Sequence, residues 1–229
     1  FSFVADHFQY LASIGVIAPL VAAAACWRPA AVRRIPAFGT VVIIAVLSAL
    51  TWRQSLVYRD AEALSRDTVR KNPAAAVAWF NLGGVLYERA LHAPPSDHRT
   101  ALLEEVILCC DEAIQRGFDN ATTHANRASA YVHLDRYDMA LRDFDKAVDL
   151  DPSSPEPFIA RAGFHLRMGQ FDLALRDCET AILLAPNYAD VFRVRAMVHY
   201  ELKSYDAALA DAMRAEALGM RLDPGFLDL

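Results

Sequence analysis

The sequence predicts an all-α protein in which a transmembrane helical hairpin is followed by an α-solenoid of helix–turn–helix units. The main observations are two long uncharged runs near the N-terminus and a period of 34 residues over positions 121–220. Charge follows the same division, because residues 1–52 hold one aspartate and three arginines while the whole 229-residue chain has a net charge of −5. The acidic excess therefore lies in the second part. Since no basic face dominates, we expect no nucleic-acid partner.

The two uncharged runs cover residues 8–27 and 35–52, with a basic loop at 28–34 between them. As helices they would be about 30 and 27 Å long, which matches the hydrocarbon core of a bilayer. They do not resemble a signal peptide, because there are two runs and neither follows a basic region. The alternative is a buried hairpin of a soluble domain, although uncharged runs of this length are typical of membranes. We therefore expect a lipid bilayer to contact residues 8–52.

The three arginines of loop 28–34 favour a cytoplasmic position for that loop. The C-terminal domain would then be periplasmic or lumenal, and the expected location is the bacterial inner membrane. Arg53 and Arg59 follow the second run and weaken this contrast. Because residues 40–71 contain no glycine or proline, we expect the second run to continue without a break into a linking helix over residues 53–73.

Residues of the same kind recur every 34 positions in the C-terminal part. Alanine lets two helices approach closely, bulky apolar residues fill the gaps between them, and Pro152 and Pro186 end two of the units. The columns are Ala128/Ala162/Ala196, Ala140/Ala174/Ala208, Ala147/Ala181/Ala215, Leu134/Met168/Leu202, Tyr137/Phe171/Tyr205, Leu141/Leu175/Leu209 and Leu150/Leu184/Leu218. This pattern closely resembles the tetratricopeptide repeat (TPR) family, which implies a right-handed superhelix with units at 121–154, 155–188 and 189–220.

An irregular unit over residues 74–120 precedes the regular ones. Its residues match the repeat only if about 11 extra positions are allowed, and the pair Pro94-Pro95 predicts that they form an inserted surface loop at about 90–101. The linking helix before it would be the second helix of a degenerate unit that caps the solenoid. Residues 221–229 would be a truncated tail, so we expect the outer face of the last unit to be under-covered and the chain to be a fragment.

Two charged columns follow the same period. Arg127, Arg161 and Arg195 are each followed 16 residues later by an aspartate, at Asp143, Asp177 and Asp211. The functional interpretation is a ladder of charged groups for a ligand. The favoured interpretation is a structural pair in each unit, because a guanidinium can bridge two packed helices while the carboxylate offsets its desolvation.

No residues with the spacing of a catalytic or metal site are present. The cysteines, at positions 26, 109, 110 and 178, lack metal or disulfide spacing, and the seven histidines do not cluster. Asn120 begins a glycosylation sequon and also suits a helix N-cap, which is the interpretation we favour. We therefore expect no catalytic residue, no metal and no small-molecule cofactor.

By resemblance, the first helices of stacked TPR units form a concave face that holds a protein or peptide. The positions of this sequence that match it are Thr122, Ser129, His133, Glu156, Ile159, Arg167, Asp190, Arg193, Met197, Tyr200 and Glu201. The Lys/Asn set with which some TPR domains clamp a C-terminal carboxylate is absent, because Thr122, Ala125, Ser129 and Ala160 stand there. A receptor for chaperone tails is therefore not expected.

The N-terminal stretch FVADHFQYLASIG (3–15) resembles a segment of the transmembrane-and-TPR, O-mannosyltransferase-like group of the GT-C glycosyltransferases, as does the linker 51–73. The motif there reads roughly ADR-x-Y-L-P-S-x-G, and this chain departs from it at His7 and Ala12 while keeping Asp6, Tyr10, Leu11, Ser13 and Gly15. The resemblance implies a transferase that uses a lipid-phosphate sugar and whose catalytic loop is not in this chain.

Two functions follow from these patterns. The first is a membrane-anchored TPR scaffold for protein–protein interaction outside the cytoplasm. The alternative is the non-catalytic C-terminal portion of a GT-C-like protein glycosyltransferase. A coding sequence that extends upstream of Phe1 with many further apolar runs would favour the second.

Overall fold

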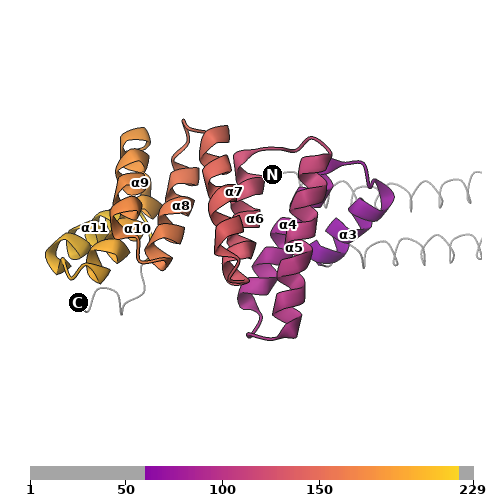
Figure 1. Ribbon diagram of the computed structural model, residues 1–229, viewed down its shortest axis with the longest axis horizontal. Helices are drawn as coiled ribbons and strands as arrows, with labels where there is room; N and C mark the ends of the chain where they lie inside the picture. The colour runs from indigo at the N-terminus through magenta and orange to yellow at the C-terminus, as the bar shows by residue number, and fades with distance from the viewer. Residues whose placement is uncertain (1–59, 222–229) are drawn as a thin grey trace, which may run out of the picture. The chain divides into compact units, whose positions relative to one another are not determined.

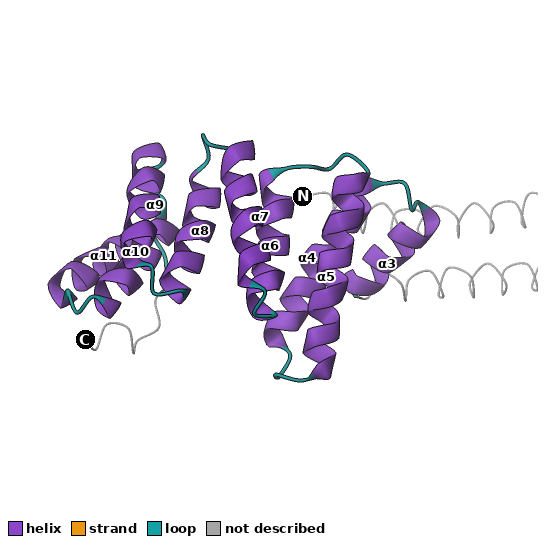
Figure 2. Cartoon of the chain, viewed as in Figure 1, coloured by secondary structure: helices purple, strands orange, loops and turns teal. Residues whose placement is uncertain are grey.

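The computed structural model describes residues 60–221, which are helical apart from short turns (Figures 1 and 2). The chain divides into two compact units, Phe1–Val57 and Tyr58–Leu229, and the described residues all belong to the second. Between residues 60 and 221 there are nine helices: α3 (Ala61–Lys71), α4 (Ala76–His92), α5 (Asp97–Gln115), α6 (Ala121–His133), α7 (Tyr137–Leu150), α8 (Pro155–Arg167), α9 (Phe171–Leu184), α10 (Ala189–Glu201) and α11 (Tyr205–Ala217).

The predicted spans 8–27 and 35–52 and the loop 28–34 lie outside the described residues. Within residues 60–221, no helix combines the length and the apolar character that crossing a membrane requires.

The prediction of an unbroken helix through residues 40–71 is wrong at Asp60. This residue has extended backbone angles, φ −134° and ψ 130°, and its side chain accepts a hydrogen bond from the Glu62 backbone N–H at 3.1 Å. Asp60 is therefore the N-cap of α3, and the helix begins at Ala61. The absence of glycine and proline did not reveal the break, because aspartate is itself a favoured cap residue.

Most helices pair with the next one along the chain. The strongest pairings are α4 with α5, α6 with α7, α8 with α9, and α10 with α11, and α3 packs on α4. Asn120 caps α6 by accepting from the Thr123 N–H at 2.9 Å, and Pro155 occupies the first turn of α8, where its missing N–H costs nothing. Asn120 thus acts as the helix cap that the sequence indicated.

The turn inside each regular unit needs one residue with positive φ. Gly169 has φ 70°, and the residues one period away on either side, Asp135 and Lys203, have φ 56° and 60°. Glycine adopts this region without strain, whereas the other two do not. The sequence alone did not reveal this column, because its three members share no chemical character.

The alanine columns lie at the helix crossings. Ala128, Ala162 and Ala196 are completely buried, as are the alanines of the other two columns. Around them lie two apolar clusters, one from Val69 to Phe164 and one from Phe158 to Ala215. Small side chains at the crossings and large ones between them give the close packing that stabilises helix pairs.

The prediction of an inserted loop at about 90–101 is wrong, because the extra residues mostly lengthen the helices α4 and α5. The helix α4 continues to His92, α5 begins at Asp97, and only residues 93–96 connect them. Ala90, Leu102 and Leu103 are buried, so the added turns carry their own core positions. The two prolines still mark the break, and Ser96 caps α5 by accepting from the Arg99 N–H.

The first helices of successive units lie against one another. The helix α6 contacts α4 and α8, and α8 contacts α10, whereas the second helices α5, α7, α9 and α11 are in no comparably extensive contact with each other in the described part of the chain. Figure 1 shows this succession of helix pairs. The exposed side of α4, α6, α8 and α10 is therefore one continuous surface, called here the first-helix face.

Candidate functional site

The structure brings each arginine of the repeated column to its aspartate. Nε and Nη2 of Arg127 donate to Asp143 at 2.7 and 2.6 Å, those of Arg161 to Asp177 at 2.9 and 2.8 Å, and those of Arg195 to Asp211 at 2.7 Å each. These pairs are bidentate, and all three carboxylates are buried. A buried carboxylate with both oxygens occupied has little capacity left for a ligand.

The same arginines also connect neighbouring units. Nη1 of Arg127 donates to Asp111 at 2.5 Å, and Nη1 of Arg161 donates to Asp145 at 2.7 Å. Both acceptors belong to the second helix of the preceding unit. The sequence analysis missed this bond, although the column Asp111/Asp145/Glu179 follows the same period and could have indicated it.

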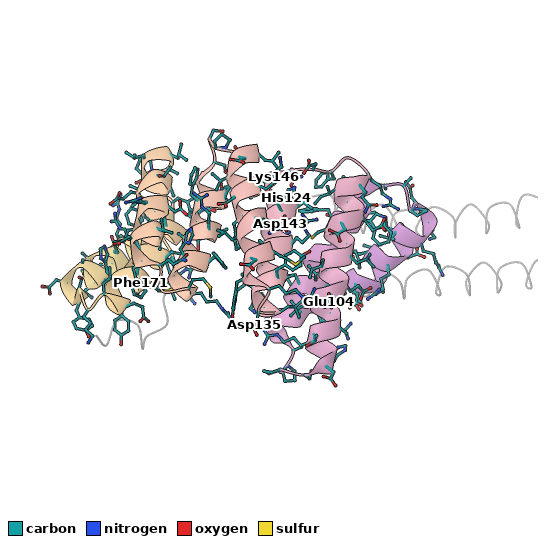
Figure 3. All side chains as sticks on the ribbon, in the orientation of Figure 1. Glu104, His124, Asp135, Asp143, Lys146 and Phe171 are labelled. Carbon is teal, nitrogen blue, oxygen red and sulfur yellow. The ribbon has the colours of Figure 1, made fainter. Side chains whose placement is uncertain are left out.

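The first regular unit also has a buried histidine that is hydrogen-bonded to the carboxylate of its Arg–Asp pair. The Nδ1 atom of His124 lies 2.9 Å from an oxygen of Asp143, and both residues are labelled in Figure 3. The Nε2 atom of His124 lies 2.7 Å from an oxygen of Asp119. The hydrogen bond to Asp143 raises the pKa of His124, and burial only partly opposes it. Burial would raise the pKa of Asp143, but hydrogen bonds from Arg127 and His124 outweigh it and lower that pKa.

The predicted peptide-contacting residues differ in their accessibility. Most are exposed or half-buried on the first helices, namely Thr122, Ser129, His133, Glu156, Arg167, Asp190, Arg193, Met197, Tyr200 and Glu201. Ile159 is the exception, because it is buried within the second apolar cluster. The contacts of Ile159 are those of a core residue, which sets it apart from the other ten predicted residues.

Two glycines leave open positions on the first helices. A Cβ atom added to Gly84 of α4 or to Gly163 of α8 would meet no heavy atom within 4 Å. Ser129 stands one period before Gly163, and its hydroxyl donates to the Ala125 carbonyl at 2.9 Å, so it projects little beyond the helix. The middle of the first-helix face is thus lined by small residues.

A basic group lies near one edge of this face. Arg99 of α5 places Nη2 3.3 Å from Nδ1 of His133, and the rings of His133 and Tyr87 have centroids 6.0 Å apart. The sequence analysis did not single out Arg99, because it falls in the region taken for an inserted loop. The only signal was a cation in the first turn of a helix, an unfavourable position for one.

The described cysteines fit a structural role. Cys109, Cys110 and Cys178 are buried, and burial raises the pKa of each thiol to about 12, which keeps it protonated and unreactive. No group of His, Cys, Asp or Glu side chains within residues 60–221 has the arrangement of a metal site.

Comparison with known families identifies the repeat. Two family models of the tetratricopeptide repeat match residues 121–154 and 165–225. The chain therefore contains tetratricopeptide repeats, and the predicted all-α TPR solenoid is confirmed for the described residues. No curated protein sequence matches the chain significantly.

Three solved structures have a fold similar to that of this chain. A thermophilic TPR protein of Thermus thermophilus is 22% identical with a TM-score of 0.55, and the match covers 71% of this chain and 78% of that one. MamA is 14% identical with a TM-score of 0.52, covering 67% and 84%. The Cut9–Hcn1 assembly of the APC/C is 16% identical with a TM-score of 0.58, covering 69% of this chain and 29% of that one.

The resemblance to O-mannosyltransferase-like proteins gains no support from these comparisons. Its motif at 3–15 lies outside the described residues, and so does the first part of the linker 51–73.

Proposed function

We propose that the solenoid is a protein–protein interaction module that binds an extended peptide segment along the first-helix face. The observation that carries this proposal is the open position at Gly163 on α8, together with the small residues Ala160 on α8 and Ser129 on α6. Because these small, uncharged side chains barely project from their helices, the main chain of a peptide can approach the helix backbones closely. The exposed residues Thr122, Glu156 and Tyr200 supply further contacts around it. TPR units elsewhere present the equivalent face to peptides, which agrees with this assignment.

The test is to fill the open position. Peptides that bind the full chain are selected from a random library, and their Kd is measured for the wild-type chain and for Gly163→Trp. We expect Gly163→Trp to weaken binding at least about tenfold, because the indole occupies the space of the peptide. The matched control is Lys146→Trp on the exposed side of α7 (Figure 3). Equal affinities for both variants would contradict the proposal.

We further propose that residues 8–52 anchor this module in a membrane. The support is the sequence itself, since runs 8–27 and 35–52 contain no charged residue. A charge at the centre of a span costs about 3 kcal/mol in insertion experiments. The double variant Ile17→Arg, Ile43→Arg should therefore leave the membrane pellet on alkaline extraction while the wild-type chain remains there. Retention of the variant would argue against spanning.

The proposed location of the solenoid is extracytoplasmic, in a bacterial inner membrane, supported by the arginines of loop 28–34. Cysteine labelling tests it, because the three described native thiols are buried with a pKa of about 12 and should be silent. Ser153→Cys places a thiol in the exposed turn after α7. A membrane-impermeant maleimide should label it in intact spheroplasts. Labelling only after lysis would place the solenoid in the cytoplasm.

A further inference from the structure

Arg99 is an arginine whose hydrogen-bonding capacity is largely unused. Its Nη2 atom lies 3.3 Å from His133 Nδ1, and no carboxylate of the described residues lies within ion-pair distance of it. Its Nε atom is buried and is the one side-chain nitrogen or oxygen among residues 60–221 found buried without a hydrogen-bond partner. Because Nε is buried, it is closed to a ligand, whereas Nη1 has no hydrogen bond among the described residues and is not buried, so Nη1 can donate to a ligand.

A second guanidinium lies at the neighbouring helix end. Arg167, in the last turn of α8, is one period after His133, in the last turn of α6, and these two helices are in contact. The Arg167 Nη2 atom is 3.9 Å from an oxygen of Asp135, which directly follows α6. Both side chains of this contact are largely exposed, so the contact neutralises Arg167 only weakly.

Helix dipoles explain only part of this arrangement. Basic residues at the C-terminal ends of α6 and α8 are favourable, because those ends carry partial negative charge. Arg99 stands in the first turn of α5, where the partial charge is positive and a cation is disfavoured. The dipole of α5 therefore does not explain why Arg99 lies beside His133.

The electrostatic environment of His133 agrees with a surplus of positive charge. Burial lowers the pKa of His133, and the charges of Arg99 and Arg167 lower it further, against a weaker opposing effect of Asp135. The neutral imidazole accepts from Arg99 through Nδ1 and so has its Nε2–H free to donate. Two guanidiniums and one imidazole N–H then form a set of donors for an anion, with Glu88 of α4 and Asp135 as the nearby acids.

We propose that Arg99, His133 and Arg167 form a carboxylate-binding site at the edge of the first-helix face, which takes an acidic side chain or the C-terminal carboxylate of the bound peptide. This inference rests on the proposed peptide-binding function and specifies its ligand. His133 and Arg167 occupy equivalent positions of two repeats, whereas Arg99 comes from the lengthened helix α5, which has no counterpart of that length in the regular repeats. Planar guanidiniums match a carboxylate in shape as well as charge.

The test uses three fluorescent peptides built on four Xaa-Gly pairs, with the full chain at low ionic strength. One has glutamate and an amidated C-terminus, one has glutamine and an amidated C-terminus, and one has glutamine with a free carboxylate. We expect at least one carboxylate-bearing peptide to bind about tenfold more tightly than the amidated glutamine peptide. Which of the two binds distinguishes a side-chain from a C-terminal carboxylate.

Substitution then assigns the site. Arg99→Gln and Arg167→Gln should each remove most of the preference for a carboxylate, whereas Arg142→Gln, on the second helix α7, should keep it. Arg167 is largely exposed, so its variant remains informative even if Arg99→Gln does not fold. Equal binding of all three peptides, no binding of any, or a preference untouched by both substitutions would overturn the proposal. If library-selected peptides still depended on Gly163, the peptide-binding function would stand without this site.

Discussion

The first regular repeat, residues 121–154, and the last, residues 189–220, use the same columns in different surroundings. Tyr137 and Leu141 of the first pack against a cluster that includes Phe164 of the next unit. Their equivalents Tyr205 and Leu209 in the last are 49% and 41% exposed. The repeat pattern thus specifies how two helices pair, whereas burial of the second helix depends on the unit that follows.

The arginine columns show the same contrast. Arg127 donates to Asp143 within its unit and to Asp111 of the unit before it. Arg195 donates to Asp211, and the position equivalent to Asp111 is occupied by Glu179, with no hydrogen bond between Arg195 and Glu179 in the described structure. The side chain of Arg195 is also the more exposed, at 26% against 18%. The polar connection between units therefore weakens toward the C-terminal end.

The largest expected effect comes from removing the shared carboxylate of the first repeat. Asp143→Ala leaves the buried His124 and the half-buried Arg127 without their common partner, and breaking such a pair typically costs about 3 kcal/mol or more. Asp211→Ala in the last repeat should cost clearly less, because Arg195 has easier access to water. Urea unfolding of the full chain, followed by circular dichroism, measures both. Equal losses would mean that the two repeats do not differ in this way.

A smaller effect should appear in an apolar column. Leu141→Ala removes a half-buried side chain that packs on the first core cluster, and we expect a loss of about 2 kcal/mol. Leu209→Ala removes a side chain that is already 41% exposed, and we expect a loss below about 1 kcal/mol. The same unfolding experiment compares them. A larger loss for Leu209 would show that another element covers the last repeat.

The sequence predicted the repeat well because period and residue size act within one unit. The alanine columns and the arginine–aspartate spacing of 16 depend on two helices that are close in sequence, and the structure brings those residues together. The sequence failed where the outcome depends on contacts between units or on the direction of one side chain. Ile159 has the right spacing for the first-helix face, but its side chain is buried in the core. The residues around Pro94 mostly extend two helices, because Leu102 and Leu103 are buried in the core there.

A pH-dependent effect should separate the first repeat from the others. Phe158 and Phe192 occupy the column of His124 in the next two units, so His124→Phe copies their chemistry. Because hydrogen bonding to Asp143 raises the pKa of His124 in the folded chain, its contribution is full below the unfolded pKa of about 6.5 and is lost as pH rises through the folded pKa. The groups that face it are Asp143, Asp119 and Arg127.

The measurement is the thermal midpoint of wild type and His124→Phe across a pH range of about 6 to 9, which brackets the titration of a histidine with a raised pKa. The advantage of the wild type over the variant should shrink as pH rises. A difference that stays constant, or that grows with pH, would show that His124 is not charged in the folded protein.

The smallest effect concerns two helix glycines and extends the comparison to the N-terminal pair. Gly163→Ala adds a methyl group where nothing lies within 4 Å, and removing a glycine from a helix interior should stabilise the fold by about 0.5–1 kcal/mol. Gly83 is buried where α4 approaches α5, and an added Cβ would lie 3.2 Å from the Cβ of Cys109. Gly83→Ala should therefore lose most of that gain to crowding. In the regular repeats the position equivalent to Gly83 is occupied by Ala128, Ala162 and Ala196. Equal stabilisation by both substitutions would therefore mean that α4 and α5 can move apart to make room for an alanine, as the helix pairs of the regular repeats do.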